Sequence, residues 1–138
     1  MFSLPLPVNY EDTDAGGVVY YANYLAYMER ARNACLREMG YPLTSLITKH
    51  KLMFVVAEAN LKYLRPARLD DNIDVTLKVL EVRPVSIRFG QQVMRGGELL
   101  VDATLKLATL NSDTFSPCKM PQDLRQSLQQ HLIEYDRK

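Results

Sequence analysis

An acidic segment near the N-terminus holds the residues best suited to chemistry. Over residues 10–17 it places Asp12 and Asp14 two positions apart and then Gly16 and Gly17. A carboxylate can attack a carbonyl carbon or take a proton from water, and glycine lets the backbone turn sharply beside a ligand. A polar stretch that ends in two glycines is typical of a loop. Ordinary turn glycines without a functional role would look the same.

The rest of the chain offers no other complete catalytic set. The only two histidines, His50 and His131, lie in polar surroundings and form no Ser-His-Asp or Cys-His arrangement. Cys35 and Cys118 have neither metal-binding nor redox spacing, and the chain has no zinc-ligand cluster. A loop carboxylate is therefore the best remaining candidate, although spacing alone leaves open that Asp14 only caps a turn or a helix.

Length and charge limit the possible functions. The 138 residues suit one domain, so we expect a single domain over 1–138. A net charge of +1 gives no electrostatic case for general nucleic-acid binding. No apolar run approaches the roughly 20 residues that span a bilayer, and Pro5 and Pro7 interrupt the short apolar N-terminus, which makes a poor signal peptide. We expect a cytoplasmic protein with reduced cysteines.

A strand and a long helix must position the acidic loop. The strand is expected over about Phe2–Asn9, at a sheet edge where prolines are tolerated. The helix is expected from about Asn23 to Met39, with Asn23 as its N-cap and Gly40 as its stop. Spacings of three and four give this helix one apolar face, made of Leu25, Met28, Ala31, Cys35, Leu36 and Met39.

After this helix the hydrophobic period changes from that of helices to that of strands. A short helix is expected over about Leu43–Lys49, and the polar tail predicts another over about Gln122–Tyr135. Strands are expected at Phe54–Leu64 and in the alternating stretches 73–79, 87–93 and 99–107, with a hairpin turn at Gly96-Gly97. Short links force the last strands into a meander. Because the long helix is the only long amphipathic element, the sheet should wrap around it, giving an α+β fold.

Two motifs carry a family resemblance. The first comprises Asp12, Asp14, Gly17, Val19, Tyr20, Tyr21 and Glu29-Arg30-Ala31-Arg32, and the second is FVVAEANLKYLRPARLDDNIDV at residues 54–75. Together they resemble the 4-hydroxybenzoyl-CoA thioesterase class of hotdog proteins, and more closely its Tol-Pal-associated acyl-CoA thioesterase branch. The resemblance implies a hotdog fold, an antiparallel sheet wrapped around one long central helix.

The resemblance also implies an activity. We expect cofactor-free hydrolysis of fatty or short-chain acyl-CoA thioesters to free acid and CoA, with an aromatic acyl group as the second candidate and acyl carrier protein as a possible replacement for CoA. Asp14 would be catalytic, as nucleophile or general base, while Asp12 more simply bonds backbone or faces solvent. Tyr21 aligns with an aromatic or His site beside the catalytic Asp. It could hydrogen-bond the substrate or the carboxylate, or only pack at the start of the helix.

Substrate-binding residues follow from the same resemblance. Gly17 would lie near the substrate, and a backbone N–H at about Met53, Phe54 or Val55 would stabilise the oxyanion. Arginines at strand ends could bind the CoA phosphates, namely Arg65, Arg68, Arg83 and Arg88. Of the basic cluster that follows the third strand in the 4-hydroxybenzoyl-CoA branch, this chain keeps only Arg83.

Glu29 carries a separate expectation. Some other hotdog thioesterases place their catalytic acid on the long helix. Here we expect instead a buried Glu29 that pairs with Arg30, Arg32 or backbone.

The resemblance also predicts how the chain assembles. Hotdog proteins generally place active sites at a dimer interface, so we expect a homodimer at least, and a homotetramer as a dimer of dimers.

A hotdog hydratase or dehydratase would use His with an acid, and residues 10–32 contain no His. A non-catalytic protein that binds acyl-CoA or acyl carrier protein, or a scaffold, would not need an intact Asp14.

Overall fold

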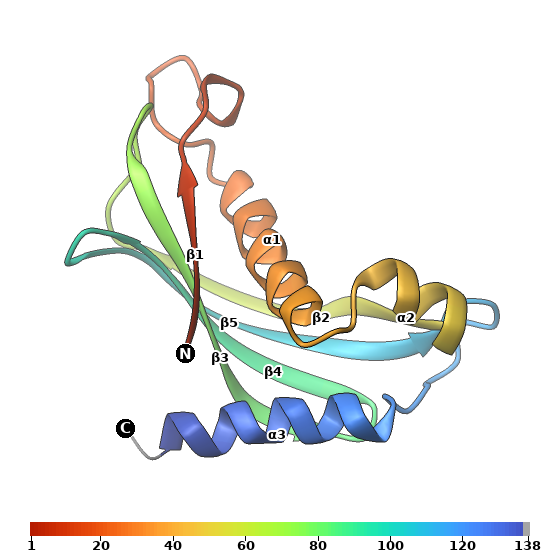
Figure 1. Ribbon diagram of the computed structural model, residues 1–138. Helices are drawn as coiled ribbons and strands as arrows, with labels where there is room; N and C mark the ends of the chain where they lie inside the picture. The colour runs from red at the N-terminus through yellow and green to blue at the C-terminus, as the bar shows by residue number, and fades with distance from the viewer. Residues whose placement is uncertain (137–138) are drawn as a thin grey trace.

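The computed structural model describes residues 1–136, with side chains through His131. One antiparallel sheet has the strand order β1-β3-β4-β5-β2, and a long helix lies across it (Figure 1). The strands are β1 (Phe2–Pro7), β2 (Leu52–Tyr63), β3 (Asn72–Arg83), β4 (Ser86–Arg95) and β5 (Glu98–Asn111). The helices are α1 (Asn23–Glu38), α2 (Leu43–His50) and α3 (Gln122–Asp136), with a short 3-10 turn η1 (Tyr10–Asp12). The predicted α+β hotdog architecture is confirmed.

Strand β2 occupies the far edge of the sheet. The meander predicted from the short links holds for β3, β4 and β5, with Gly96 at positive φ (61°) in the β4–β5 hairpin. Strand β2, although it precedes β3 in the chain, pairs instead with β5, from Leu52 opposite Asn111 to Tyr63 opposite Val101. One side of β2 therefore has no neighbouring strand within the described chain.

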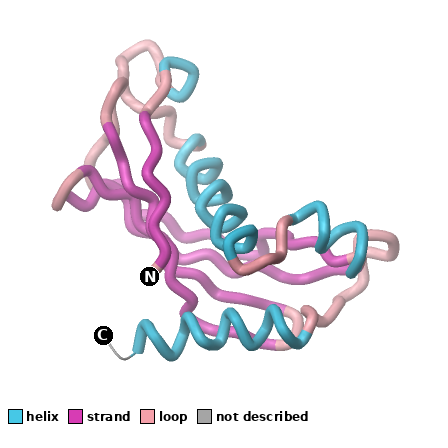
Figure 2. The backbone as a smooth tube through the Cα atoms, viewed as in Figure 1, coloured by secondary structure: helices cyan, strands magenta, loops and turns pink. Residues whose placement is uncertain are grey.

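The core lies between α1 and one face of the sheet. Strand side chains alternate between two faces, and in β3, β4 and β5 the odd-numbered residues are the buried ones over most of each strand. The buried residues of α1 are Tyr24, Tyr27, Met28, Ala31, Arg32, Cys35 and Leu36. Figure 2 shows the helix crossing the sheet at this face. Full burial of each large apolar side chain contributes about 1.5–3 kcal/mol, which fixes the orientation of α1.

The start of α1 differs from the expectation in two ways. Ala22 occupies the N-cap position, and the Asn23 side chain instead donates a hydrogen bond to the Asp12 carbonyl oxygen (2.8 Å). Leu25 is 40% exposed, so its assignment to the apolar face was wrong. The Tyr24 hydroxyl accepts a hydrogen bond from the Ala67 N–H (3.0 Å), and this contact turns Tyr24, not Leu25, toward the body of the protein.

The other two helices also pack against the sheet. Helix α2 packs against β2, with Leu46 fully buried, and α3 packs against β3 through Leu124 and Leu128 (Figure 1). Both lie close to their predicted bounds. Within the described residues, no helix is long and apolar enough to cross a membrane.

Candidate active site

Asp12 organises the loop that precedes α1. Its side chain is buried, at 7% exposure, and one carboxylate oxygen accepts a hydrogen bond from the Asn9 N–H (2.9 Å). Its carbonyl oxygen accepts hydrogen bonds from the Tyr20 N–H and from the Asn23 side chain. The buried Tyr27 hydroxyl also faces this carboxylate. Burial is the main cause that raises the pKa of Tyr27, and the neighbouring Asp12 raises it further. Asp12 thus joins the loop to the first turns of α1.

Asp14 lies in the same loop but has different surroundings. Its side chain is exposed, and Oδ1 accepts a hydrogen bond from the Gly16 N–H (2.9 Å). Among the described residues, no donor bonds the other carboxylate oxygen. Backbone bonds on both sides hold the residue, from the Asp14 N–H to Val18 and from the Gly17 N–H to the Asp14 carbonyl. The carboxylate is therefore positioned by the loop and still free to contact a ligand.

Gly17 allows the loop to close. Its φ of +77° lies in the left-handed region that favours glycine. Its carbonyl accepts a hydrogen bond from the Leu69 N–H (3.1 Å), and the next contact, from the Val19 N–H to the Ala67 carbonyl, is 2.9 Å. The acidic loop is thereby fixed to the turn that joins β2 to β3.

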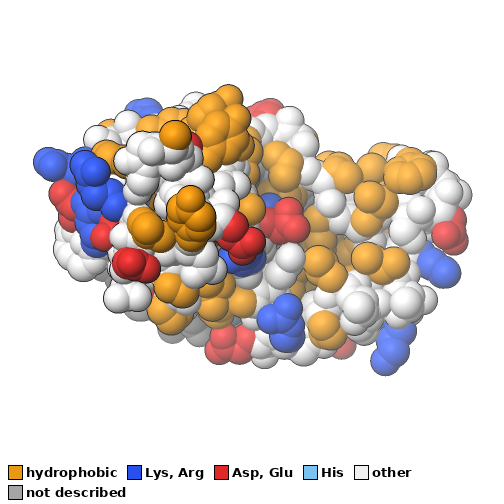
Figure 3. All heavy atoms as spheres, turned by 90° about the horizontal axis from the view of Figure 1, so that it is seen from above, with side chains coloured by type: hydrophobic (Ala, Val, Ile, Leu, Met, Phe, Trp, Pro, Cys, Tyr) orange, Lys and Arg blue, Asp and Glu red, His pale blue; other side chains and the backbone are white. Residues whose placement is uncertain are grey.

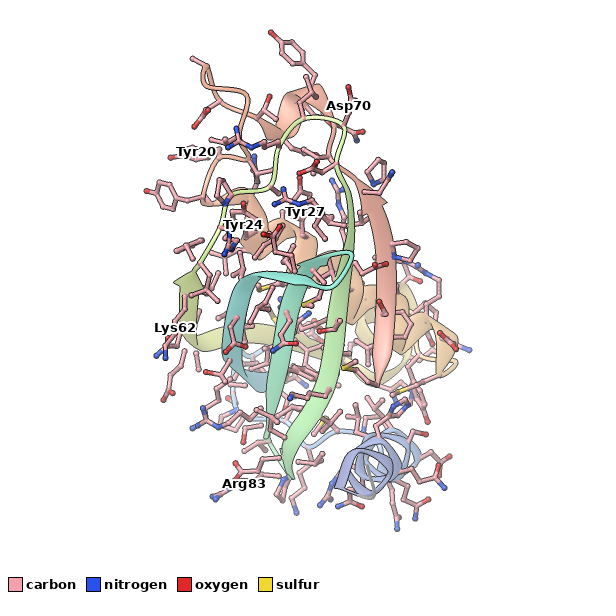
Figure 4. All side chains as sticks on the ribbon, turned by 90° about the vertical axis from the view of Figure 1, so that its left-hand side faces the viewer. Tyr20, Tyr24, Tyr27, Lys62, Asp70 and Arg83 are labelled. Atoms are coloured by element: carbon pink, nitrogen blue, oxygen red, sulfur yellow. The ribbon has the colours of Figure 1, made fainter. Side chains whose placement is uncertain are left out.

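A group of tyrosines surrounds a hollow beside this loop. The Tyr63 ring lies 6.4 Å from Tyr21 and 5.7 Å from Tyr24 between centroids, and the Tyr21 ring lies 4.9 Å from Tyr20. Tyr21 is 62% exposed and lines the hollow together with Tyr24, Tyr63 and Arg65. Burial raises the pKa of Tyr24. Figure 4 shows Tyr20, Tyr24 and Tyr27 grouped at one end of the molecule.

An apolar cavity of about 260 Å³ lies farther along α1. It is enclosed by α1, α2, β2 and the sheet, and its walls include Met53 and Phe54. Val55 is half-buried and is not part of its wall. In Figure 3, which looks down from above, hydrophobic side chains gather on the right-hand side, where α2 lies over the sheet. The structure thus places Met53 and Phe54 at this cavity and Asp14, Gly17 and Tyr21 at the loop.

The structure contradicts the prediction that Glu29 is buried. It is exposed, it forms no ion pair with any residue that the structure describes, and it lines the cavity. The buried member of this helix turn is Arg32, whose Nη1 donates a hydrogen bond to the Gln91 side-chain oxygen (3.0 Å). The predicted buried Glu29 with an arginine partner is wrong, because the helix turns Arg32 toward the sheet and Glu29 toward solvent.

Arg83 lies away from both groups of residues. It stands at the end of β3 and forms an exposed ion pair with Glu81 (3.0 Å). Figure 4 shows it at the opposite end of the molecule from the tyrosines. Two other candidate arginines are also paired: Arg65 with Glu98 (3.3 Å) and Arg88 with Glu58 (3.7 Å). Within one chain, the structure does not bring Arg83 to Asp14.

Comparison with known proteins identifies the family. The model of the Thioesterase-like superfamily matches residues 8–128. The chain belongs to this superfamily. It is 40% identical over 124 residues to the acyl-CoA thioesterase YbgC of Haemophilus influenzae, covering 90% of this chain and 91% of the relative. It is 34% identical over 125 residues to the acyl-CoA thioester hydrolase YbgC of Escherichia coli O6:H1, covering 90% and 92%.

A solved structure agrees with the assignment. The probable thioesterase of Bartonella henselae superposes with a TM-score of 0.82 at 30% identity, over 86% of this chain and 98% of that one. Membership of the Thioesterase-like superfamily confirms the resemblance that the two motifs predicted.

Some residues of this thioesterase-like site were missed from sequence. Tyr24 and Tyr63 line the hollow, and Arg32, which lines the cavity, donates a hydrogen bond to Gln91. Gln91 stands within an alternating strand at a position that should be apolar, and this was a usable signal. Arg32 is one of two arginines in the motif, and sequence alone does not say which of them turns inward.

Proposed function

We propose that this chain, as one domain over residues 1–138, hydrolyses acyl-CoA thioesters to free acid and CoA with Asp14 as the catalytic carboxylate. The named activities of its Haemophilus and Escherichia relatives support the reaction. The observation that carries the residue assignment is the contrast between the two acids. Asp12 is buried and bonds the loop backbone, whereas Asp14 is exposed and keeps one carboxylate oxygen free.

Hydrolysis breaks the thioester C–S bond and forms a C–O bond, and the departing sulfur takes up a proton. Asp14 can attack the carbonyl carbon to give an anhydride that water then opens, or it can remove a proton from the attacking water. Either route places negative charge on the carbonyl oxygen. Alternate N–H groups of an edge strand point away from its one neighbour, so an amide at Met53, Phe54 or Val55 on the open side of β2 is a suitable donor for that charge.

The two parts of this proposed site lie apart within one chain. Asp14 precedes α1, whereas Arg32 and Leu36 at the cavity lie roughly 14 and 20 Å along the axis from Asn23, at about 1.5 Å per residue. Strand β2 connects the two regions. It runs past the cavity at Met53 and ends at Tyr63 beside the loop.

Pairing of two copies would bring these parts together. The middle of β2, residues 56–60, is exposed, and its free edge is a template for another strand. Antiparallel pairing about the middle of Leu52–Tyr63 sets Met53 and Phe54 of one copy beside the partner's Tyr63 and the loop next to it. We therefore propose a homodimer whose site combines Asp14 of one copy with the cavity of the other. A tetramer would be a dimer of such dimers.

The substrate carrier and reaction class can be tested directly. Thiol release would be measured with purified protein on acetyl-, butyryl-, hexanoyl-, decanoyl- and benzoyl-CoA, and on the matching acyl carrier protein thioesters. We expect CoA release from at least one acyl-CoA. Binding without release would favour a non-catalytic acyl-binding protein, and hydration of an enoyl-CoA would favour a hydratase.

Asp14→Asn tests the residue assignment. The substitution keeps the shape and removes the charge, so the fold and substrate binding should largely survive while kcat falls roughly 10²–10⁴-fold. Asp12→Asn is the matched control, and its kcat should fall far less. Thermal melts would confirm that both variants fold. A folded Asp14→Asn protein with near-native kcat would exclude Asp14 as the catalytic group, and loss of turnover in Asp12→Asn alone would exchange the two roles.

A further inference from the structure

The cavity contains a charged group that the proposed chemistry does not use. Most of its wall is apolar, from Leu36, Leu43, Phe54, Ile87, Phe89 and Leu107 among others, but α1 adds Glu29, Arg32 and Asn33. Arg32 is 6% exposed. A buried cation without an ion-pair partner lowers the stability of a protein. Its presence in this cavity therefore indicates a function for Arg32.

The guanidinium of Arg32 has unused hydrogen-bonding capacity. It carries five N–H donors, and the structure shows one side-chain bond, from Nη1 to Gln91 Oε1. Among the described residues no carboxylate oxygen lies within 4.0 Å of the Arg32 guanidinium. Each of its nitrogens that makes no hydrogen bond is accessible to solvent. The remaining donors are therefore open to the cavity that Arg32 lines.

Gln91 holds the arginine without neutralising it. The Gln91 side-chain nitrogen donates to the Met28 carbonyl oxygen (3.0 Å), so its oxygen is fixed toward Arg32. An amide supplies a hydrogen bond but no negative charge. Burial lowers the pKa of Arg32, and the more distant, exposed Glu29 partly offsets this effect. A buried, oriented guanidinium that has no carboxylate within ion-pair distance is suited to receive a carboxylate through two parallel hydrogen bonds.

We propose that Arg32 selects the acyl group, and that the preferred thioesters carry a carboxylate at the far end of a short chain. The inference rests on the proposed thioesterase function and specifies its substrate class. The space is sufficient, because an apolar cavity of about 150 Å³ holds a benzene ring and this one measures about 260 Å³. The apolar wall would contact the methylene groups, and Arg32 would bind the terminal carboxylate.

Substrates of matched chain length test the proposal. The values of kcat/KM would be measured for succinyl-, glutaryl- and adipyl-CoA and for butyryl-, valeryl- and hexanoyl-CoA. In the wild-type protein the best dicarboxylic thioester should exceed its uncharged counterpart by roughly 10- to 100-fold, the usual worth of a hydrogen-bonded charge. A wild-type ratio of one or less would overturn the proposal whatever the variants do.

Two variants separate recognition from a structural role. Arg32→Met keeps similar length without charge, and it should lower kcat/KM for the dicarboxylic thioester roughly 10-fold or more beyond its effect on the uncharged one. Gln91→Glu leaves Arg32 in place but neutralises it, and it should reduce the same ratio. Equal losses on both substrates in both variants would reduce Arg32 to a structural link between α1 and β4.

The inference and the proposed function can fail separately. If the wild-type protein hydrolyses no thioester of either series or of the wider acyl-CoA panel, the proposed function fails and the inference with it. If uncharged thioesters are hydrolysed well and the charged ones are not preferred, the function stands and the role of Arg32 is refuted.

Discussion

The two ends of α1 are built in different ways. At its N-terminal end, a loop is held by backbone hydrogen bonds and by the buried Asp12, and it presents the exposed carboxylate of Asp14. Farther along, side chains from α1, α2, β2, β4 and β5 enclose an apolar cavity with one buried cation. The acidic loop is one short stretch of sequence that backbone hydrogen bonds tie to the β2–β3 turn, whereas the wall of the cavity is assembled from five separate elements. The proposed reaction needs both regions. Substitutions in the element that joins them should therefore reduce turnover most.

We propose the open edge of β2 as that joining element, and blocking it should have the largest effect. Ala57 lies at the register shift between Val56 and Glu58 and has no paired residue on β5. Ala57→Pro removes its N–H and should block pairing of two copies while leaving the β2–β5 ladder largely intact. We expect a monomer by light scattering at micromolar concentration, with turnover reduced at least about 10²-fold.

Ala57→Val is the matched control, because it keeps the N–H. It should remain dimeric and active. A wild-type protein or an Ala57→Pro variant that is a fully active monomer would refute the proposed joint site.

The loop end should lose stability when its hydrogen bonds are removed. Asp12→Ala deletes the acceptor for the Asn9 N–H, a capping interaction whose loss typically costs about 0.5–2 kcal/mol. Urea denaturation would measure the free energy of unfolding. Asp14→Ala also deletes an acceptor, for the Gly16 N–H, but water can replace it at this exposed position, so its free energy of unfolding should stay within about 0.5 kcal/mol of wild type. Equal effects at the two positions would contradict the division of roles.

The other end of α1 should respond to alkaline pH. Burial raises the pKa of the Cys35 thiol from 9.0 to about 11. Between these values the unfolded chain releases the proton and the folded protein keeps it, so the free energy of unfolding falls as pH rises. The loss attributable to Cys35 should approach about 2–3 kcal/mol by pH 11, from 1.36 kcal/mol per pKa unit.

Cys35→Ala provides the comparison for this pH effect. Its stability should decline less steeply than that of wild type between pH 9 and 11, with the remaining decline coming from other groups such as the buried Tyr24 and Tyr27. Parallel curves for the two proteins would show that Cys35 makes no such contribution.

The contrast between the two ends also explains what could be predicted from sequence. Strand periodicity, the long helix and the acidic loop are local patterns, and these gave the fold, the family and the placement of Asp14 and Gly17 at one loop. The inward turn of Arg32 instead of Glu29, and the burial of Tyr24 instead of Leu25, depend on contacts with Gln91 and Ala67. Gln91 shows in the sequence only as a polar residue within an alternating strand, and nothing in the sequence indicates that Ala67 meets Tyr24.

Other predictions stay open for a different physical reason. The roles proposed for Asp14, Tyr21, Val55 and Arg83 concern contacts with a substrate and with the proposed second copy, so they stay predictions. The cytoplasmic location and the tetramer likewise remain predictions. The position of β2 beside β5 became visible only in the structure, because hydrophobic alternation does not say which strands are neighbours.

A mixing experiment tests the joint site most directly. Asp14→Asn removes the carboxylate, and Met53→Trp fills the cavity, so each protein alone should be nearly inactive. Co-refolded dimers that combine the two would contain one site with both defects and one with neither, and random pairing should restore about a quarter of wild-type turnover. If Asp14 acted instead on the cavity of its own chain, every mixed dimer would carry one defect in each site. A mixture no more active than its two components would therefore contradict the account.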